Sequence, residues 1–328
     1  MFKVSVIVPV YNAANFLAKA VDSILIQPEV GEIVLIEDQS KDNSYQIAKQ
    51  LSEQHAIIKL ITHPNHVNRG ASASRELGIE MASFPFVAFL DADDYYLPNR
   101  FNFEPQIFEI HSDADGVYGA TGFAYYSEDG KERYAKYNST GLTTLDRAVP
   151  PDELFYVLSG ISKKANGYFH LNALTIKKAA VAPNRAGNFN PNMGLHEDTE
   201  WIFRLSLKTK LYPGSIDHAI AMRGVHNDNR IVKNQAEYVT KHIMYKTVYT
   251  WAKANNLTPE QTSIVRLNML AVKLFLVNYI CALTIIICLF INYFKLVRNR
   301  TYIRRILERL FGENTFRYFF SVYKQKTL

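Results

Sequence analysis

The chain has 328 residues, 48% hydrophobic and 21% charged, and this composition excludes an intrinsically disordered protein. Its two cysteines, Cys281 and Cys288, lie in one apolar stretch, which argues against a disulfide-rich or zinc-finger fold. Residues 1–230 hold 22 Lys and Arg against 27 Asp and Glu, whereas residues 231–328 hold 15 against 4, so we expect the basic tail to meet an anionic partner.

The N-terminal part of the chain alternates between apolar runs and amphipathic helical patterns. The runs are nearly continuous in Val, Ile, Leu and Phe, as in strands that are buried on both faces. This alternation predicts an α/β fold with a mostly parallel sheet and helices on both of its faces. The expected strands cover 4–10, 32–38, 57–63 and 85–91, and the expected helices cover 16–25, 42–54 and 71–82.

Polar residues follow three of these strands, in the sequences YN, EDQS and DADD. In parallel sheets, ligands bind at the edge formed by the carboxyl ends of the strands. In extended backbone, Asp91 and Asp93 would point to one side and Asp94 to the other. Two carboxylates on one side are suited to a hard divalent cation such as Mg²⁺ or Mn²⁺. The alternative is an Asp-rich turn that only caps a following helix.

The pattern from about residue 100 to 230 is less regular. We expect strands at 116–126 and 170–178 and a helix at 196–208. These elements would complete the sheet and form a wall of the ligand-binding crevice.

Residues 231–328 have a different character, and we expect them to form a helical region that associates with a membrane. Residues 274–294 form an uncharged stretch of 21 residues, long enough at roughly 1.5 Å per residue to cross a bilayer core of about 30 Å. In 298–311, apolar residues line one helical face and arginines the other, as in helices that lie in a membrane interface.

The topology of this tail stays open between a peripheral, a re-entrant and a single-span arrangement. A single crossing at 274–294 would export a segment with nine Lys and Arg and only two Glu, against the positive-inside tendency. A re-entrant or in-plane arrangement would keep the arginines near anionic headgroups. A buried helix at a dimer interface is the alternative.

Five motifs together resemble family 2 glycosyltransferases of the GT-A fold, which is a Rossmann-like fold. They are VSVIVPVYN, LIEDQSKDNS, RGASASRELGIEMA, FLDADD and GLHEDTEWIFRL, in the order and at the spacing of that family. The resemblance covers roughly residues 3–230. It implies a catalytic domain at 1–230, with a nucleotide-sugar-binding half at 1–100, an acceptor-side half at 101–230, and a helical region at 231–328.

The resemblance implies where the nucleotide sugar binds. Asp38 would accept a hydrogen bond from the base, although Glu37 and Gln39 replace the first Asp and the Gly of the usual D-D-G-S pattern. Arg75 would face the diphosphate, and a solvated helix face is its alternative. The residues implied in nucleotide-sugar binding are Pro9, Tyr11, Asn12, Asp38, Arg75, Asp91 and Asp93.

The resemblance also implies the metal ligands and the catalytic carboxylates. Asp91 and Asp93 would hold the metal and the ribose, with Asp93 favoured for direct ligation, and His226 would contact the diphosphate or the metal. Asp198, with Glu197 beside it, would be the catalytic base under the acceptor. A pair of acids favoured by the dipole at a helix start is the alternative for these two residues.

These implications amount to one function, an inverting and metal-assisted glycosyltransferase that takes the sugar from a nucleotide sugar, with UDP expected. The cofactor would be Mn²⁺ or Mg²⁺, and the acceptor would be a glycan or a lipid-linked hydroxyl compound in polysaccharide or glycolipid assembly. We expect the protein on the cytoplasmic face of the cell membrane. Nucleic acid is not an expected partner, and a homodimer stays open.

Two other functions compete with this interpretation. A nucleotidyltransferase would need a Gly- and Lys/Arg-rich phosphate loop near the first strand, and PVYNAAN does not provide one. A non-catalytic scaffold that binds nucleotide sugars would not need Asp93 and Asp198 together. A dinucleotide oxidoreductase is disfavoured, because no G-x-G-x-x-G follows the first strand.

Overall fold

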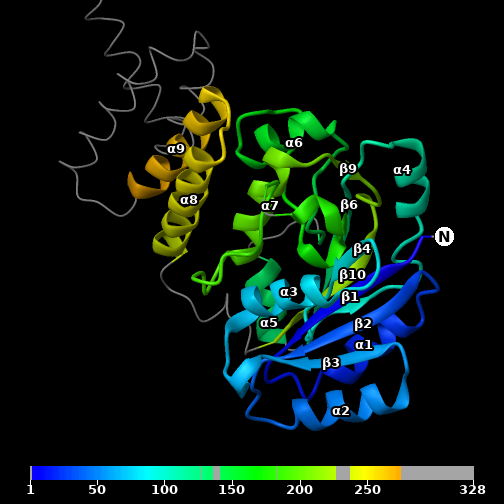
Figure 1. The fold of residues 1–328 in the computed structure, drawn as a ribbon. Coiled ribbons are helices and arrows are strands. Elements are labelled where there is room, and N and C mark those ends of the chain that lie inside the picture. The colour runs from blue at the N-terminus through cyan, green and yellow to red at the C-terminus, as the bar shows by residue number, and fades with distance from the viewer. Residues whose placement is uncertain (1, 127, 136–140, 183, 227–236, 275–328) are drawn as a thin grey trace, which may run out of the picture. The chain divides into compact units, whose positions relative to one another are not determined.

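The computed structural model describes residues 2–126, 128–135, 141–182, 184–226 and 237–274. The described residues belong to two compact units, Met1–Gln235 and Ala236–Leu328. The first unit contains a seven-stranded sheet in the order β3-β2-β1-β4-β8-β6-β9 and a three-stranded sheet in the order β5-β10-β7 (Figure 1).

The first four strands of the large sheet are parallel, as the sequence predicts. They are β1 (Val4–Val10), β2 (Val30–Glu37), β3 (Ile58–Thr62) and β4 (Phe86–Phe89). The helices α1 (Leu17–Leu25), α2 (Ser44–Gln54) and α3 (Gly70–Met81) connect them. Helices α1 and α2 lie on one side of these strands and α3 lies on the other (Figure 1).

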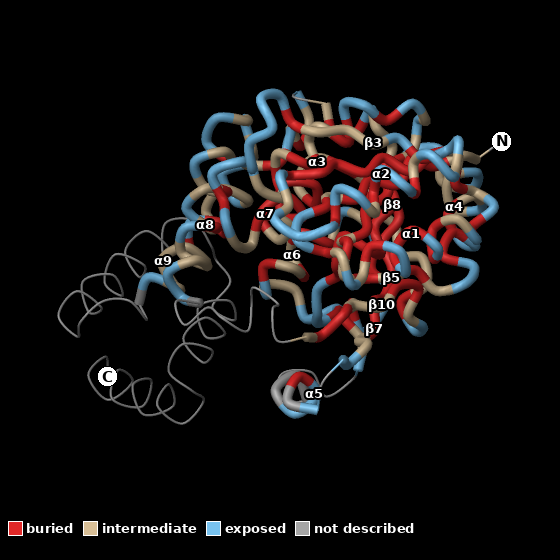
Figure 2. Tube along the Cα trace, turned by 90° about the horizontal axis from the view of Figure 1, so that it is seen from below, coloured by how far each residue is buried: buried red, intermediate tan, exposed pale blue. Residues whose placement is uncertain are grey.

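Alternate side chains of β1 enter two hydrophobic cores, one on each face of the sheet. Val6 and Val8 pack with Leu17 and Ile24 of α1 in one core. Ile7 points the other way and joins the second core, which contains Trp201. Figure 2 shows that buried segments concentrate in the strands, while the exposed segments lie around them. The apolar runs form strands because both of their faces are covered.

The large sheet is completed by β8 (Leu174–Lys177), β6 (Gly116–Tyr118) and β9 (Leu211–Pro213). β8 is antiparallel to both of its neighbours, β4 and β6. Helices α4 (Glu104–Ile110), α6 (Pro151–Leu158) and α7 (Glu197–Lys208) accompany these strands. The helix expected at 196–208 is therefore confirmed, and the strand expected at 170–178 is reduced to β8.

The small sheet shows that the single strand expected at 116–126 is wrong. The strand is interrupted at Gly119. β6 stays in the large sheet, whereas β7 (Ala120–Tyr125) pairs with β10 (Ala219–Val225) in the small sheet. A Cβ at Gly119 would lie 2.6 Å from a side-chain carbon of Ile220 and 2.8 Å from the carbonyl oxygen of Ser215. Only glycine fits this crossing point. Strand β5 (Tyr95–Tyr96) is the third strand of this sheet and is antiparallel to β10, and helix α5 (Glu128–Ala135) follows β7 in the chain.

The second unit contains two described helices, α8 (Glu237–Ala254) and α9 (Pro259–Leu274). A ring nitrogen of His242 lies 3.2 Å from the carbonyl oxygen of Met269, which ties the two helices to each other. No helix within the described ranges is both long enough and apolar enough for a bilayer crossing. The predicted apolar segment 274–294, apart from Leu274, and the predicted basic helix 298–311 lie outside the described residues.

Candidate active site

Arg75 connects the two halves of the candidate site. Its side chain extends from α3 and is 3% exposed; Nη2 donates to Asp91 Oδ1 at 2.6 Å and Nη1 donates to Glu197 Oε1 at 3.4 Å. Burial alone would lower the pKa of Arg75, but the two carboxylates raise it, so the guanidinium stays charged. The end of β4 is thus tied to the start of α7, over a separation of more than a hundred residues.

The backbone after β4 forms a turn. The extended backbone expected at Asp91, Asp93 and Asp94 is therefore wrong. The amide of Asp94 donates to the carbonyl of Asp91 at 3.0 Å. The turn gathers carboxylate oxygens of Asp91 and Asp94 with a ring nitrogen of His170 within 4.8 Å of one another. Asp93 instead faces His226, whose Nε2 lies 3.0 Å from Asp93 Oδ2.

Asp94 is a buried member of this cluster, with 5% of its surface exposed. Its carboxylate accepts hydrogen bonds from the side-chain amide of Asn172 and from the backbone N–H of Gly224 at 2.6 Å. Burial raises the pKa of Asp94, and the neighbouring Asp93 and Asp91 raise it further. A Cβ on Gly224 would lie 2.3 Å from the carbonyl oxygen of Asp93, so only glycine allows this close approach of β10 to the turn after β4.

Asp198 begins α7 beside His170. His170 Nε2 lies 3.7 Å from Asp198 Oδ2, and the backbone N–H of Thr199 donates to Asp198 Oδ1 at 2.7 Å. Burial lowers the pKa of His170 to about 4, and the charge of Arg223 adds to this, so the imidazole is neutral near pH 7. Burial would raise the pKa of Asp198, but His170 and Arg75 hold it below its usual value. Asp198 is therefore an ionised and 28% exposed carboxylate.

The Asp38 carboxylate has a structural role that was not expected from the sequence. Its two carboxylate oxygens accept from the backbone amides of Arg69, at 2.6 Å, and Gly70, at 2.8 Å, at the start of α3. His63 Nε2 lies 3.6 Å from the same carboxylate. Asp38 is 3% exposed, and its contact with a base stays a prediction.

The other predicted nucleotide-binding residues lie at the end of β1. Tyr11 is 44% exposed, and Asn12 adopts a positive φ of 50°. The side-chain oxygen of Asn12 accepts from the amide of Lys41 at 2.7 Å, and its own amide donates to Ser40 Oγ at 3.0 Å. Pro9 is partly buried in β1 itself. The loops after β1 and β2 are thus fixed to each other.

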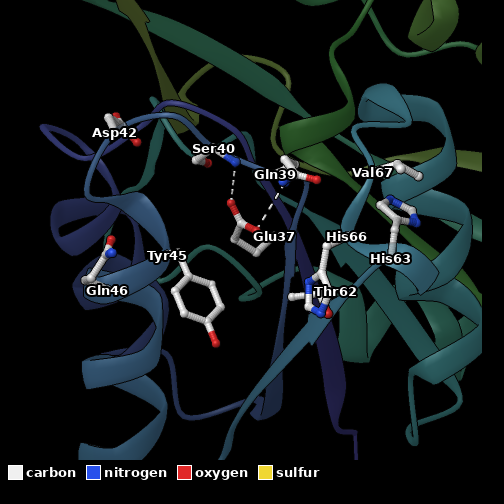
Figure 3. A pocket seen from close by; sticks show the side chains of 10 residues that line it. All are labelled: Glu37, Gln39, Ser40, Asp42, Tyr45, Gln46, Thr62, His63, His66 and Val67. Atoms are coloured by element: carbon white, nitrogen blue, oxygen red, sulfur yellow. Dashed lines mark hydrogen bonds between the residues drawn. The ribbon is translucent and has the colours of Figure 1, made fainter.

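A pocket of about 290 Å³ opens beside the end of β2 (Figure 3). Tyr45 of α2 and His66 lie on opposite sides of Glu37, whose carboxylate accepts from the amides of Ser40 at 2.6 Å and Gln39 at 3.1 Å (Figure 3). The pocket has a polar and aromatic lining, which suits a nucleobase. The lining residues are Glu37, Gln39, Ser40, Asp42, Tyr45, Gln46, Thr62, His63, His66 and Val67.

The carboxylate and imidazole groups near the end of β4 are suited to bind a divalent cation. Carboxylate oxygens are the ligands that Mg²⁺ and Mn²⁺ prefer, and two groupings that combine them with an imidazole meet here. One is the predicted pair Asp93 and His226, and the other consists of Asp91, Asp94 and His170.

Three further residues lie around the predicted acids and were not expected from the sequence: His170, Asn172 and Arg223. The polar residues of the sequence HLN, directly before an apolar run, are the signal that could have indicated the first two. Arg223 carries no such signal, because a single charged residue in an otherwise apolar run does not by itself indicate a site.

Comparison with known proteins finds a family model that matches part of the chain. Residues 5–163 match the family model described as Glycosyl transferase family 2. This match is shorter than the resemblance expected over residues 3–230, so Glu197, Asp198 and His226 lie beyond it. Two of these are the predicted catalytic carboxylates.

Curated relatives match the chain over limited segments. The uncharacterised glycosyltransferase YibD of Escherichia coli is 35% identical over 132 residues, which are 38% of this chain and 38% of that protein. The succinoglycan biosynthesis protein ExoU of Rhizobium meliloti is 35% identical over 97 residues, which are 30% of this chain and 28% of that protein. The matches thus span less than half the length of these relatives.

Solved structures with a similar fold cover more of the chain. The S. aureus protein TarS 1-349 in complex with UDP-GlcNAc has a TM-score of 0.62 at 17% identity, covering 82% of this chain and 72% of that one. The mannosyltransferase PcManGT from Pyrobaculum calidifontis, in complex with GDP-Man and Mn²⁺, has a TM-score of 0.52 at 15% identity, covering 80% and 68%. At such identities the likeness shows the fold alone.

Proposed function

Because residues 5–163 match the model of glycosyl transferase family 2, we propose that the chain transfers a sugar from a nucleotide sugar to a hydroxyl acceptor, with inversion and with the assistance of a divalent metal. UDP-sugars are the first donors to test, and the nucleotide-sugar complexes of the structural relatives support a donor of this class. The acceptor would be a growing glycan or a lipid-linked hydroxyl compound.

The observation that carries this proposal is the bridge made by Arg75. One buried cation joins Asp91, at the end of β4, to Glu197, beside the predicted base Asp198. The donor side and the acceptor side of a transferase must be held in register, because the attacking oxygen has to approach the sugar opposite the leaving group. Nε of Arg75 is buried and has no acceptor among the described residues.

The carboxylates can divide the chemistry between donor and acceptor. Asp93 and His226 would hold a divalent ion, which when bound neutralises the charge of the leaving diphosphate. The leaving group then needs no proton, so one base is sufficient, unlike the two carboxyl groups of glycoside hydrolysis. Asp198 would remove the proton of the acceptor hydroxyl, because its carboxylate is ionised at neutral pH.

The environment of Asp198 favours this assignment. His170 is neutral near pH 7 and its Nε2 lies 3.7 Å from the carboxylate, and the positive charge of Arg75 helps to hold the pKa of Asp198 below its usual value. The carboxylate remains 28% exposed, so an acceptor can reach it.

Substitution of Asp198 by Asn tests the proposal, because it keeps the shape and removes the base. Asp198→Asn should lower sugar transfer by at least about a hundredfold, in line with typical general-base contributions, and leave the donor Kd within about twofold. Asp152→Asn, at an 82% exposed carboxylate, is the matched control and should leave transfer unchanged. Equal loss of transfer and donor binding would contradict the assignment. Absence of transfer and of donor hydrolysis in the wild type would favour a non-catalytic scaffold.

We also propose that the basic tail holds the enzyme on the cytoplasmic face of the membrane. The proposal rests on the excess of Lys and Arg over Asp and Glu in residues 231–328, 15 against 4. Alkaline carbonate extraction distinguishes the arrangements. Full release of the intact protein would exclude a span at 274–294, and retention would exclude a purely electrostatic attachment.

A further inference from the structure

The small sheet brings three distant residues to one end. β7 and β10 are parallel and pair Tyr125 with Val225, so Tyr126 and His226 follow side by side. β5 is antiparallel to β10 and pairs Tyr95 with Met222, which places Asp93 at the same end. His226 therefore meets Asp93 through sheet topology, and its Nε2 lies 3.0 Å from Asp93 Oδ2.

The face of the His226 imidazole is covered by a residue of another element. The ring of Phe16, directly before α1, stacks on the imidazole with a centroid separation of 4.7 Å and an interplanar angle of 24°. The ring of Tyr126 packs against Phe16 at 5.4 Å in a tilted arrangement. An imidazole at a strand end can rotate about its side-chain bonds, so a stacked ring restricts the direction in which Nε2 points.

Lys19 fixes the far side of this aromatic group. Its ammonium donates to the Tyr126 hydroxyl at 3.0 Å and lies 3.7 Å from the ring centroid of Tyr95. Lys19 is one turn along α1 from Phe16, so the start of this helix holds the ends of β5, β7 and β10 together. The contacts form a continuous path from α1 to His226 and Asp93.

The position of Phe16 in α1 does not favour the helix. It is the N-cap residue, and its side chain makes no capping hydrogen bond. Ser, Thr, Asp and Asn are preferred at this position because they satisfy a free backbone amide. The sequence thus places an aromatic ring where helix stability favours a short polar side chain, so capping does not account for Phe16.

We propose that Phe16 is a positioning residue, whose ring holds the imidazole of His226 beside Asp93 and so sets the affinity of this pair for a divalent cation. The inference rests on the proposed function, in which Asp93 and His226 contact the metal. Partners that orient a metal-ligating histidine typically change metal affinity by about 10- to 100-fold when they are removed.

The test uses Mn²⁺ titrations of the full chain, followed by thermal shift. Each titration contains a fixed concentration of one nucleoside diphosphate, chosen from UDP, GDP, CDP and ADP as the one that stabilises the wild type most. Phe16→Ser and Phe16→Leu should weaken the apparent Mn²⁺ affinity about tenfold, whereas Phe16→Tyr should stay within about twofold. Phe16→Ser introduces a capping side chain, so its melting temperature without Mn²⁺ should not fall with the affinity.

Phe103 provides a matched control. It is the N-cap residue of α4, also without a side-chain capping bond, and is 50% exposed. Phe103→Ser should leave the Mn²⁺ affinity unchanged. In a His226→Gln background, Phe16→Leu should cost no further affinity, because Phe16 acts only through the imidazole.

The outcomes separate this inference from the proposed function. Wild-type Mn²⁺ affinity in both Phe16→Ser and Phe16→Leu overturns the inference alone. The inference is also overturned if Phe16→Leu weakens Mn²⁺ binding as much in the His226→Gln background as it does in the wild-type background. If the wild type shows no response to Mn²⁺ with any of the four nucleotides, the metal-assisted function and the inference both fail.

Discussion

Replacing Arg75 by Met should strongly destabilise the protein, because it leaves two acidic side chains without their cation. The Glu197 side chain is 5% exposed and the Asp91 side chain is 26% exposed, and both lie within hydrogen-bonding reach of the guanidinium, at 3.4 and 2.6 Å. Removing one partner of a buried ion pair typically costs about 3–5 kcal/mol. Asp91 is partly solvated, so its share is discounted, and we expect a loss of about 3 kcal/mol.

Urea unfolding at pH 7 measures this loss directly, and two further variants show its origin. Arg75→Lys keeps the charge but cannot bridge both acids with a planar fork, so it should lose about 1–2 kcal/mol. The double variant Arg75→Met with Glu197→Gln should recover about 1 kcal/mol or more relative to Arg75→Met, because the buried negative charge is then gone.

A result for Arg75→Met within about 0.5 kcal/mol of the wild type, the range of ordinary surface substitutions, would refute this reasoning. Failure of Glu197→Gln to recover stability in the double variant would show that the buried charge is not the cause.

Two further predictions concern the β2 and β3 ends. Gln39 has a positive φ of 59°, so Gln39→Gly should stabilise the protein by about 1 kcal/mol in urea unfolding while Gln39→Ala should not, and equal behaviour of the two variants would contradict a backbone origin. Burial lowers the pKa of His63 below its usual value of 6.5, more than Asp38 raises it, so the unfolded chain binds the proton first as the pH falls. Stability should therefore fall as the pH drops below about 6.5, and the loss in thermal unfolding between pH 7 and pH 5 should be smaller in His63→Gln, whereas an unchanged loss would contradict the role of His63.

The parallel half of the sheet could be predicted because each strand is a local pattern. The apolar run at 4–10 is β1 residue for residue, and helices α1, α2, α3 and α7 lie within two residues of the expected bounds. β8 could not be placed in this way. It enters the sheet between β4 and β6 in the antiparallel direction, and this pairing depends on residues that are distant in the chain.

In the candidate site, too, local patterns could be predicted and contacts between distant residues could not. The position of Asp91 and Asp93 after a buried strand, and of Asp198 at a helix start, is visible in the sequence. The turn that joins Asp91 to Asp94, and the Gly224 amide that Asp94 accepts from, arise where two sheets meet and carry no local signal. The roles of these residues in binding and catalysis stay predictions.

The most direct test of the account is a calorimetric titration of nucleotide sugars into the wild type and Asp93→Asn, with and without Mn²⁺. The account predicts that at least one nucleotide sugar binds the wild type, that Mn²⁺ strengthens this binding, and that Asp93→Asn removes the effect of Mn²⁺. Ligand at about 100 times its Kd should also stabilise the wild type by about 2.7 kcal/mol. Absence of heat with every nucleotide sugar, or an undiminished effect of Mn²⁺ on Asp93→Asn, would contradict it.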